Sequence, residues 1–313
     1  MPRAPLLALL APTLLAAAAA VAAPRVATDI APVHSIAARV MAGVGEPGLI
    51  LPPGASPHGY ALRPSEARLL QDADLVVWIG PTLTPWLADP IATLAPEATL
   101  VTLATVAGVE TLPIRAGGPF EAHEHDHDDE HDQEAHHRQP PEAIDGHLWL
   151  DPDNAVAMAR AIAAALAEAD PANAAAYRAN AEAFAAGTEA RAATIEARVA
   201  PLRGRPFIVF HDGYQYFEQR FDLPAAGSIA LHDGDAPGTA RIAALRERVI
   251  ADGVVCAFAE PEFPPALLGT VIEGTSARAG RLDGIGAGLT PGPGLYPALL
   301  DSLVDGLEAC LAP

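Results

Sequence analysis

The feature that most constrains the fold of this chain is an alanine-rich stretch from Pro171 to about Ala200. Arginine and glutamate are interspersed with the alanines, and the main interruption is Gly187, so the stretch predicts one helix of about thirty residues. At about 1.5 Å per residue such a helix is about 45 Å long, which is longer than a lobe is wide. We expect a rigid rod joining two lobes; the alternative is a solvent-exposed surface helix of a single domain.

On both sides of this helix, short apolar segments alternate with helical stretches, which indicates an α/β architecture. Before it we expect strands at 26–29, 48–51, 75–78, 99–103 and 147–150, and helices at 34–42, 64–72 and 152–167. After it we expect strands at 206–210, 254–258 and 281–283, and helices at 214–221, 239–252, 264–278 and 296–311. The predicted fold is two α/β lobes, each a sheet flanked by helices: residues 24–170, a linking helix 171–202, and residues 203–313.

The first 23 residues have the pattern of a signal peptide. Arg3 supplies the positive charge, an apolar run begins at Leu6, and Ala20-Val21-Ala22 is a small-residue cleavage motif. We expect an exported protein that is cut after Ala22 or Ala23. The alternative is a transmembrane anchor, because the apolar run is nearly long enough to span a bilayer.

The 313-residue chain is strongly acidic, with a formal net charge of −20 at pH 7. This charge argues against nucleic acid and anionic membrane surfaces as partners.

Residues 121–139 combine histidine with acidic residues at a density that no packed core could accommodate. Neutral imidazoles and carboxylates together attract zinc and other first-row divalent ions. We interpret the segment as an auxiliary metal-collecting loop, and the alternative is a solvated acidic linker. Its interchangeable, poorly oriented ligands do not suit a tight site, so the specific site is expected elsewhere. The histidines of this loop are His123, His125, His127, His131, His136 and His137.

The two cysteines, Cys256 and Cys310, are most simply a disulfide in an exported protein. Closing a loop of that size would stabilise the fold by roughly 4 kcal/mol on the chain-entropy model. A metal site that includes cysteine is the competing interpretation.

Three single histidines, His58, His147 and His211, each lie at or just beyond an apolar strand-like segment. Ligands of open α/β sheets bind at the carboxyl ends of strands, so these residues can converge although they are distant in sequence. Asp283 follows another predicted strand and lies beside glycines. Three imidazoles with one carboxylate form a plausible tetrahedral zinc set, and water is the alternative fourth ligand.

Several segments of the chain resemble the metal-binding solute receptors of ABC importers, specifically the periplasmic zinc-uptake receptors. They cover nearly the whole mature chain in the family's order and spacing. The resemblance implies two α/β lobes bridged by one long helix, a metal buried at their interface, and a surface that docks on a membrane permease. The segments are GASPHGYALRPSEARLL, GHLWLDPDNA, VFHDGYQYF, VVCAFAEPEF and GTSARAGRLDGIG.

The resemblance carries the family's three metal histidines onto His58, His147 and His211, and its fourth-ligand carboxylate onto Asp283. Manganese receptors that resemble this family have a glutamate at the position of His211, and imidazole suits zinc better than harder oxygen ligands do. Some zinc receptors have a glutamate directly before the first histidine, where this chain has Pro57. That position cannot supply a carboxylate here.

We therefore expect a periplasmic, non-enzymatic and monomeric protein that binds Zn²⁺ and delivers it to an ABC permease. The histidine-rich loop would raise the local zinc concentration or take zinc from a periplasmic carrier. The alternatives are a manganese or iron receptor of the same family and a secreted zinc hydrolase or hydratase. Three further residues receive less weight: we expect a structural role for His34, a surface-loop position for His232, and either a histidine-orienting role or an ordinary ion pair for Glu260.

Overall fold

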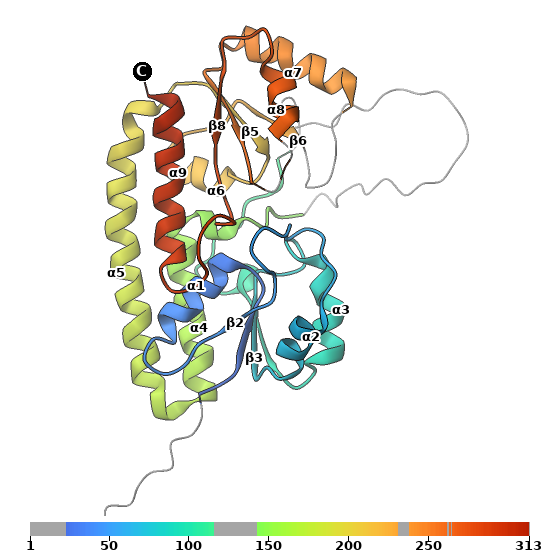
Figure 1. Ribbon diagram of the computed structural model, residues 1–313. Helices are drawn as coiled ribbons and strands as arrows, with labels where there is room; N and C mark the ends of the chain where they lie inside the picture. Colours follow the sequence, from blue (N-terminus) through green and yellow to red (C-terminus); the bar gives the residue numbers. More distant parts are fainter. Residues whose placement is uncertain (1–22, 116–142, 231–237, 262, 264, 313) are drawn as a thin grey trace, which may run out of the picture.

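The computed structural model describes residues 23–115, 143–230, 238–261, 263 and 265–312. Figure 1 shows two sheets, one above the other, with helices around both. The strands are β1 (Val26–Thr28), β2 (Gly48–Leu49), β3 (Leu75–Trp78), β4 (Thr99–Thr102), β5 (Phe207–His211), β6 (Gly227–Ala230), β7 (Cys256–Ala259) and β8 (Arg278–Arg281). The helices are α1 (Ala31–Val40), α2 (Pro64–Gln71), α3 (Ala88–Leu94), α4 (Pro152–Ala169), α5 (Ala174–Val199), α6 (Gln215–Phe221), α7 (Thr239–Ala251), α8 (Pro265–Ile272) and α9 (Leu295–Leu311).

The two sheets share one strand order, and their paired strands are parallel. The N-terminal sheet has the order β2-β1-β3-β4 and the C-terminal sheet the order β6-β5-β7-β8. Parallel strands are normally covered on both faces, and β3 is buried at every position from Leu75 to Trp78. The predicted pair of α/β lobes is confirmed, and each lobe presents the carboxyl ends of its strands as a candidate binding edge.

The alanine-rich stretch forms α5, which continues into a 3₁₀ turn at each end, Pro171–Asn173 and Ala200–Leu202. In Figure 1 the helix runs beside both sheets. It contacts α1 and α4 of the N-terminal half and α6 and α9 of the C-terminal half. The predicted rod is therefore confirmed, and the alternative of a surface helix on one domain is wrong.

The C-terminal helix α9 also reaches the N-terminal half. The backbone N–H of Tyr296 donates to Ser35 Oγ at 2.9 Å, and its hydroxyl donates to the carbonyl oxygen of Trp149 at 2.9 Å. Both bonds are buried, and the surrounding apolar core contains residues of both halves. The two lobes therefore share one core rather than meeting only at a linker.

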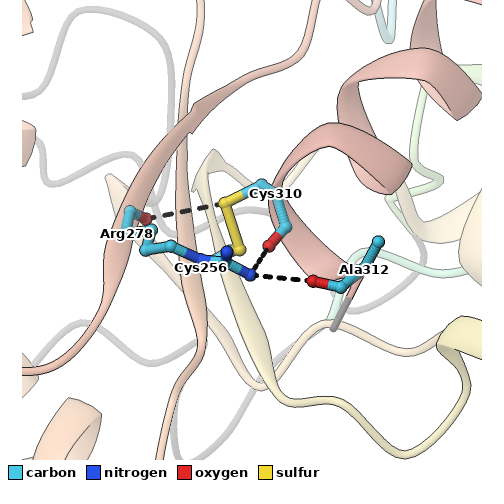
Figure 2. Close-up of a disulfide and its surroundings, with 4 residues drawn as sticks. All are labelled: Cys256, Arg278, Cys310 and Ala312. Carbon is cyan, nitrogen blue, oxygen red and sulfur yellow. Dashed lines mark hydrogen bonds between the residues drawn. A yellow bond between two sulfur atoms is a disulfide. The ribbon is translucent and has the colours of Figure 1, made fainter.

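The predicted disulfide between Cys256 and Cys310 is confirmed, and it joins β7 to α9. The competing cysteine metal site is therefore wrong. Figure 2 shows Arg278, on the neighbouring strand β8, donating to the carbonyl oxygens of Cys310 and Ala312. These carbonyls lie at the end of α9, where the helix itself offers no donor. The bridge and the arginine together fix the end of α9 against the sheet.

Three local predictions need correction, and two elements were not predicted. The piece 147–150 is not a strand: Leu148–Leu150 form a 3₁₀ turn that leads into α4, which Asp151 caps through its side chain. Helix α8 is shorter than expected, and β8 ends two residues before the predicted strand end at Asp283. Strand β6 and helix α3 were not predicted.

Three expectations concern residues outside the described ranges: the signal peptide 1–23, except for Ala23, the histidine-rich segment 121–139, and His232. Within the described part of the chain, no helix combines the length and the apolar character needed to cross a bilayer.

Candidate metal centre

His58 lies in an irregular segment that follows β2. The segment is held at several points. The backbone N–H of His58 donates to Ser56 Oγ at 3.2 Å, and the indole N–H of Trp86 donates to the carbonyl oxygen of Pro57 at 2.7 Å. The hydroxyl of Tyr60 donates to Glu66 Oε1 at 2.8 Å, at the start of α2. Prolines and these bonds give the segment a defined course without regular secondary structure.

His147 lies directly before the 3₁₀ turn and is paired with Asp145. The Oδ1 atom of Asp145 lies 2.7 Å from His147 Nδ1 and accepts the backbone N–H of His147 at 2.9 Å. Burial by itself raises the pKa of Asp145, but the charge and hydrogen bonds of His147 outweigh it and hold that pKa below its ordinary value. An ionised carboxylate only accepts, so it places the ring hydrogen on Nδ1 and leaves Nε2 with a lone pair.

His211 is the last residue of β5 and is paired with Glu260 in the same way. Glu260 directly follows β7, which pairs with β5, so the parallel register brings the two strand ends together. Its Oε1 atom lies 2.8 Å from His211 Nδ1 and accepts the backbone N–H of His211 at 3.2 Å. Glu260 therefore has the histidine-orienting role, and its side chain is 3% exposed.

The structure brings the three predicted histidines together. One nitrogen from each of His58, His147 and His211 lies within 4.8 Å of the others. The Nε2 atoms of His147 and His211 are 3.2 Å apart, and the ring centroids are separated by 5.4 Å for His58 and His147 and by 6.4 Å for His58 and His211. A divalent ion among these atoms would accept lone pairs that otherwise face one another.

The pocket around the histidines is mostly apolar, a lining that would limit the access of water to an ion held there. Gly213 leaves the space that an ion needs: a Cβ atom there would lie 2.3 Å from His211 Nε2 and 3.0 Å from His147 Nε2. The other lining residues are Pro57, Trp149, Tyr214, Glu260, Phe263, Gly284 and Ile285.

Asp283 is not part of the cluster. Its Oδ1 atom accepts the backbone N–H groups of Gly286 at 2.7 Å and Ala287 at 2.9 Å, and its Oδ2 atom accepts that of Gly288 at 2.9 Å. These bonds close the loop after β8, and among the described residues the metal-binding group contains only the three histidines. The prediction that Asp283 is the fourth ligand finds no support in these contacts, in which the carboxylate closes a loop.

His34 has the structural role that was expected. Its Nε2 atom lies 3.1 Å from the carbonyl oxygen of Pro47, and burial lowers its pKa. Sequence reasoning missed Asp145 and Gly213. The available signal was their spacing in the sequence: Asp145 lies two residues before His147, and Gly213 lies two residues after His211.

Comparisons with known proteins agree with this geometry. The family model for the periplasmic zinc-uptake complex component A, ZnuA, matches residues 26–310. The high-affinity zinc uptake system protein ZnuA of Brucella suis is 42% identical, and the match covers 92% of this chain and 91% of the relative. The protein of the same name from Paracoccus denitrificans is 39% identical, with 92% of each chain covered.

Solved structures share the fold at lower identity. A crystal structure of ZnuA has a TM-score of 0.76 and 22% identity, and the match covers 93% of this chain and 100% of the other. The Pseudomonas aeruginosa protein FpvC in complex with Mn²⁺ has a TM-score of 0.74 and 21% identity, with 92% and 99% covered.

Proposed function

The chain belongs to the family of periplasmic zinc-uptake components, and on this basis we propose that it binds zinc at its three-histidine cluster and delivers it to an ABC-type membrane permease. The observation that carries the proposal is the convergence of His58, His147 and His211, of which two are oriented by buried carboxylates. Zinc prefers tetrahedral nitrogen and sulfur ligands, and its histidine ligands usually donate the other ring N–H to such a partner. Water completes the proposed ligand set.

Zinc is favoured over manganese or iron because the described donor set consists of imidazoles. Manganese prefers oxygen ligands in octahedral order. Among the described residues that line the pocket, Glu260 is the one carboxylate, and it accepts from the ring and backbone of His211. It is therefore engaged as an orienting partner of that ligand.

A transport role also accounts for the site better than hydrolysis does. Three histidines and a water form a catalytic set in zinc hydrolases, where a general base must lie within hydrogen-bond reach of the attacking water. Glu260 is occupied by His211, and the remaining described lining residues offer no other carboxylate. We expect the zinc-loaded protein to show no turnover in ester hydrolysis or carbon dioxide hydration, and measurable turnover would overturn the carrier role.

We further propose that residues 121–139 are an auxiliary zinc-collecting segment of a monomeric periplasmic protein, which raises the local zinc concentration or accepts zinc from a periplasmic carrier. The described residues that flank the segment support this division of labour. Pro113 and Ile144 form an antiparallel bridge, and the N–H of Ile114 donates to the carbonyl oxygen of Ala143 at 3.0 Å. The described chain before residue 116 and after residue 142 is thus joined at one closed base, so we expect that removing residues 121–139 leaves the fold intact.

The test is a competitive metal titration of the mature protein with mass spectrometry of the bound metal. The wild type is compared with a His211→Ala variant and a variant that lacks residues 121–139. We expect one tight zinc that survives the deletion and is severely weakened by His211→Ala. Tight manganese binding, or zinc binding that ignores His211, would contradict the proposed site and cargo. Loss of the tight site on deletion would contradict the auxiliary role of the segment.

A further inference from the structure

Two polar contacts join the halves of the chain beside the three histidines, and the proposed function does not use them. Arg115 of the N-terminal half contacts Asp212 and Glu218 of the C-terminal half. Tyr216 of the C-terminal half contacts the backbone of Leu112 and Asp145. Arg115 thus reaches Asp212, the residue after His211. Tyr216 reaches Asp145, the residue that pairs with His147.

The guanidinium of Arg115 lies between two carboxylates. Its Nε atom donates to Asp212 Oδ1 at 3.0 Å and one terminal nitrogen donates to Glu218 Oε2 at 2.6 Å. The three side chains are 21%, 10% and 4% exposed for Arg115, Asp212 and Glu218. Planar, paired donors of this kind fix geometry more strongly than a single point charge does.

The two carboxylates lie on either side of the short connection between β5, which ends at His211, and α6. Asp212 directly follows His211 at the end of β5, and Glu218 lies in α6. Gly213, between them, faces the Nε2 atoms of both His211 and His147. By bonding Asp212 and Glu218, Arg115 fixes the connection between β5 and α6. A shift of this connection would move His211 relative to the other two proposed ligands.

Tyr216 is the corresponding contact from the C-terminal half to the N-terminal half. Its hydroxyl donates to the carbonyl oxygen of Asp145 at 2.8 Å and accepts the backbone N–H of Leu112 at 2.9 Å. The Asp145 carboxylate in turn bonds the ring and the backbone of His147. The C-terminal half therefore fixes the residue that orients the histidine of the N-terminal half.

We propose that Arg115 and Tyr216 are positioning residues through which each half of the chain sets the orientation of the other half's metal histidine. The inference rests on the proposed zinc site and adds that its geometry is created across the lobe interface. Neither residue contacts the three histidines in the described contacts; each acts through a residue that does, or through its neighbour in the chain. Supporting contacts of metal ligands affect affinity because they limit the orientations that a ligand can take.

The test uses the full mature protein with Zn²⁺ and Co²⁺ as probes. Arg115→Gln removes the charge, and Tyr216→Phe removes the hydroxyl while keeping the ring. We expect each to weaken zinc binding by about tenfold, the lower end of the effect of losing a ligand's supporting partner. We also expect a shifted d–d absorption band of the bound Co²⁺, because the arrangement of the ligands changes.

The chain offers a matched control for each variant. Arg198→Gln removes an arginine that likewise bonds two carboxylates, Asp305 and Glu308, but these lie on α9. Tyr177→Phe removes a buried hydroxyl that donates to Asp170 Oδ2 at 2.9 Å. Both controls are expected to lower stability and to leave the zinc affinity and the Co²⁺ band unchanged.

Equal zinc affinity and an unchanged Co²⁺ band in the test and control variants would overturn the inference while leaving the proposed function intact. A wild type that binds no zinc, or binds it independently of His211, would overturn both. If Arg115→Gln does not fold, Arg115→Lys replaces it: one ammonium cannot reproduce the paired contacts with both carboxylates. The lysine variant is then expected to bind zinc more weakly than the wild type and to shift the band, and wild-type values would overturn the inference.

Discussion

Trp86 donates its indole N–H to the carbonyl oxygen of Pro57, the residue directly before His58. Its ring also packs edge-on against Tyr60, with the centroids 5.5 Å apart. One side chain therefore holds the chain on both sides of His58, in a segment without helix or strand. This relationship makes Trp86 an anchor of the segment that carries the first proposed ligand.

We expect Trp86→Phe to weaken zinc binding by up to about tenfold, because it removes the N–H that fixes Pro57 while retaining most of the packing. Competitive zinc titration measures the effect. Trp78→Phe is the matched control, since the Trp78 indole donates to Thr102 Oγ1 at 2.9 Å in the sheet. Equal affinities of the two variants would contradict a specific role for Trp86.

Gly213→Ala is expected to weaken zinc binding by about a hundredfold or more, because the added Cβ would occupy the space between His147 and His211. Isothermal titration or chelator competition would measure it. Gly187→Ala is the control: this glycine lies in α5 with no atom within 4 Å of an added Cβ. That change should stabilise the helix by about 1 kcal/mol and leave zinc binding intact. A Gly213→Ala protein with wild-type affinity would place the metal elsewhere.

Asp29 should make the stability of the metal-free protein depend on pH. The fully buried carboxylate accepts N–H groups of Ile30 and Ile79, and burial raises its pKa to about 7. Because the folded state then binds a proton that the unfolded state has released, stability falls as pH rises from about 4 to about 7. One such group contributes a slope of up to about 1.4 kcal/mol per pH unit.

Chemical denaturation between pH 5 and pH 8 would measure this slope in the wild type and in Asp29→Ser. The variant is expected to be less stable at low pH and to lose this part of the pH dependence. Parallel curves for the two proteins would show that Asp29 does not titrate in this range.

Replacing both cysteines by serine should lower the free energy of unfolding by about 4 kcal/mol on the chain-entropy model, because Cys256 and Cys310 are 54 positions apart. Zinc affinity should not change, since the bridge joins α9 to the first residue of β7 (Figure 2), at the opposite end of that strand from Glu260. Denaturation of the wild type with and without a reductant gives an independent measure. A reduced protein with unchanged stability would contradict the expectation.

Much of the fold was predictable because its elements follow local rules. The strand Leu75–Trp78 is apolar at every position, and α5 has the alanine content and length of a long helix. Strand β6 was missed because its four residues, GSIA, have little strand preference, and α3 because it contains a proline. The sequence predicts a strand where the structure has a short apolar turn after His147, because so brief an apolar run has no periodicity that distinguishes a strand from a helical turn.

The rule that strand ends of parallel sheets gather at one edge accounts for only part of the convergence: His211 ends β5, whereas His58 lies in the segment after β2 and His147 precedes a 3₁₀ turn. Asp283 does not lie at a strand end: the strand before it ends at Arg281, and its carboxylate accepts backbone N–H groups of its own loop. The pairing of His211 with Glu260 depends on β5 lying beside β7. That strand order is a property of the whole sheet and is not encoded in any local motif.

The order in which the histidines occur along the chain has a consequence for folding. His147 and His211 are 64 positions apart in the chain. His147 belongs to the N-terminal half and His211 to the C-terminal half, and α5 lies between them in the sequence. A chain whose N-terminal half alone has folded can present at most two of the three imidazoles, and such a pair holds zinc weakly. If zinc binds at the proposed three-histidine site, the complete set of imidazoles exists only after both halves have docked, so tight zinc binding would occur only in fully folded molecules.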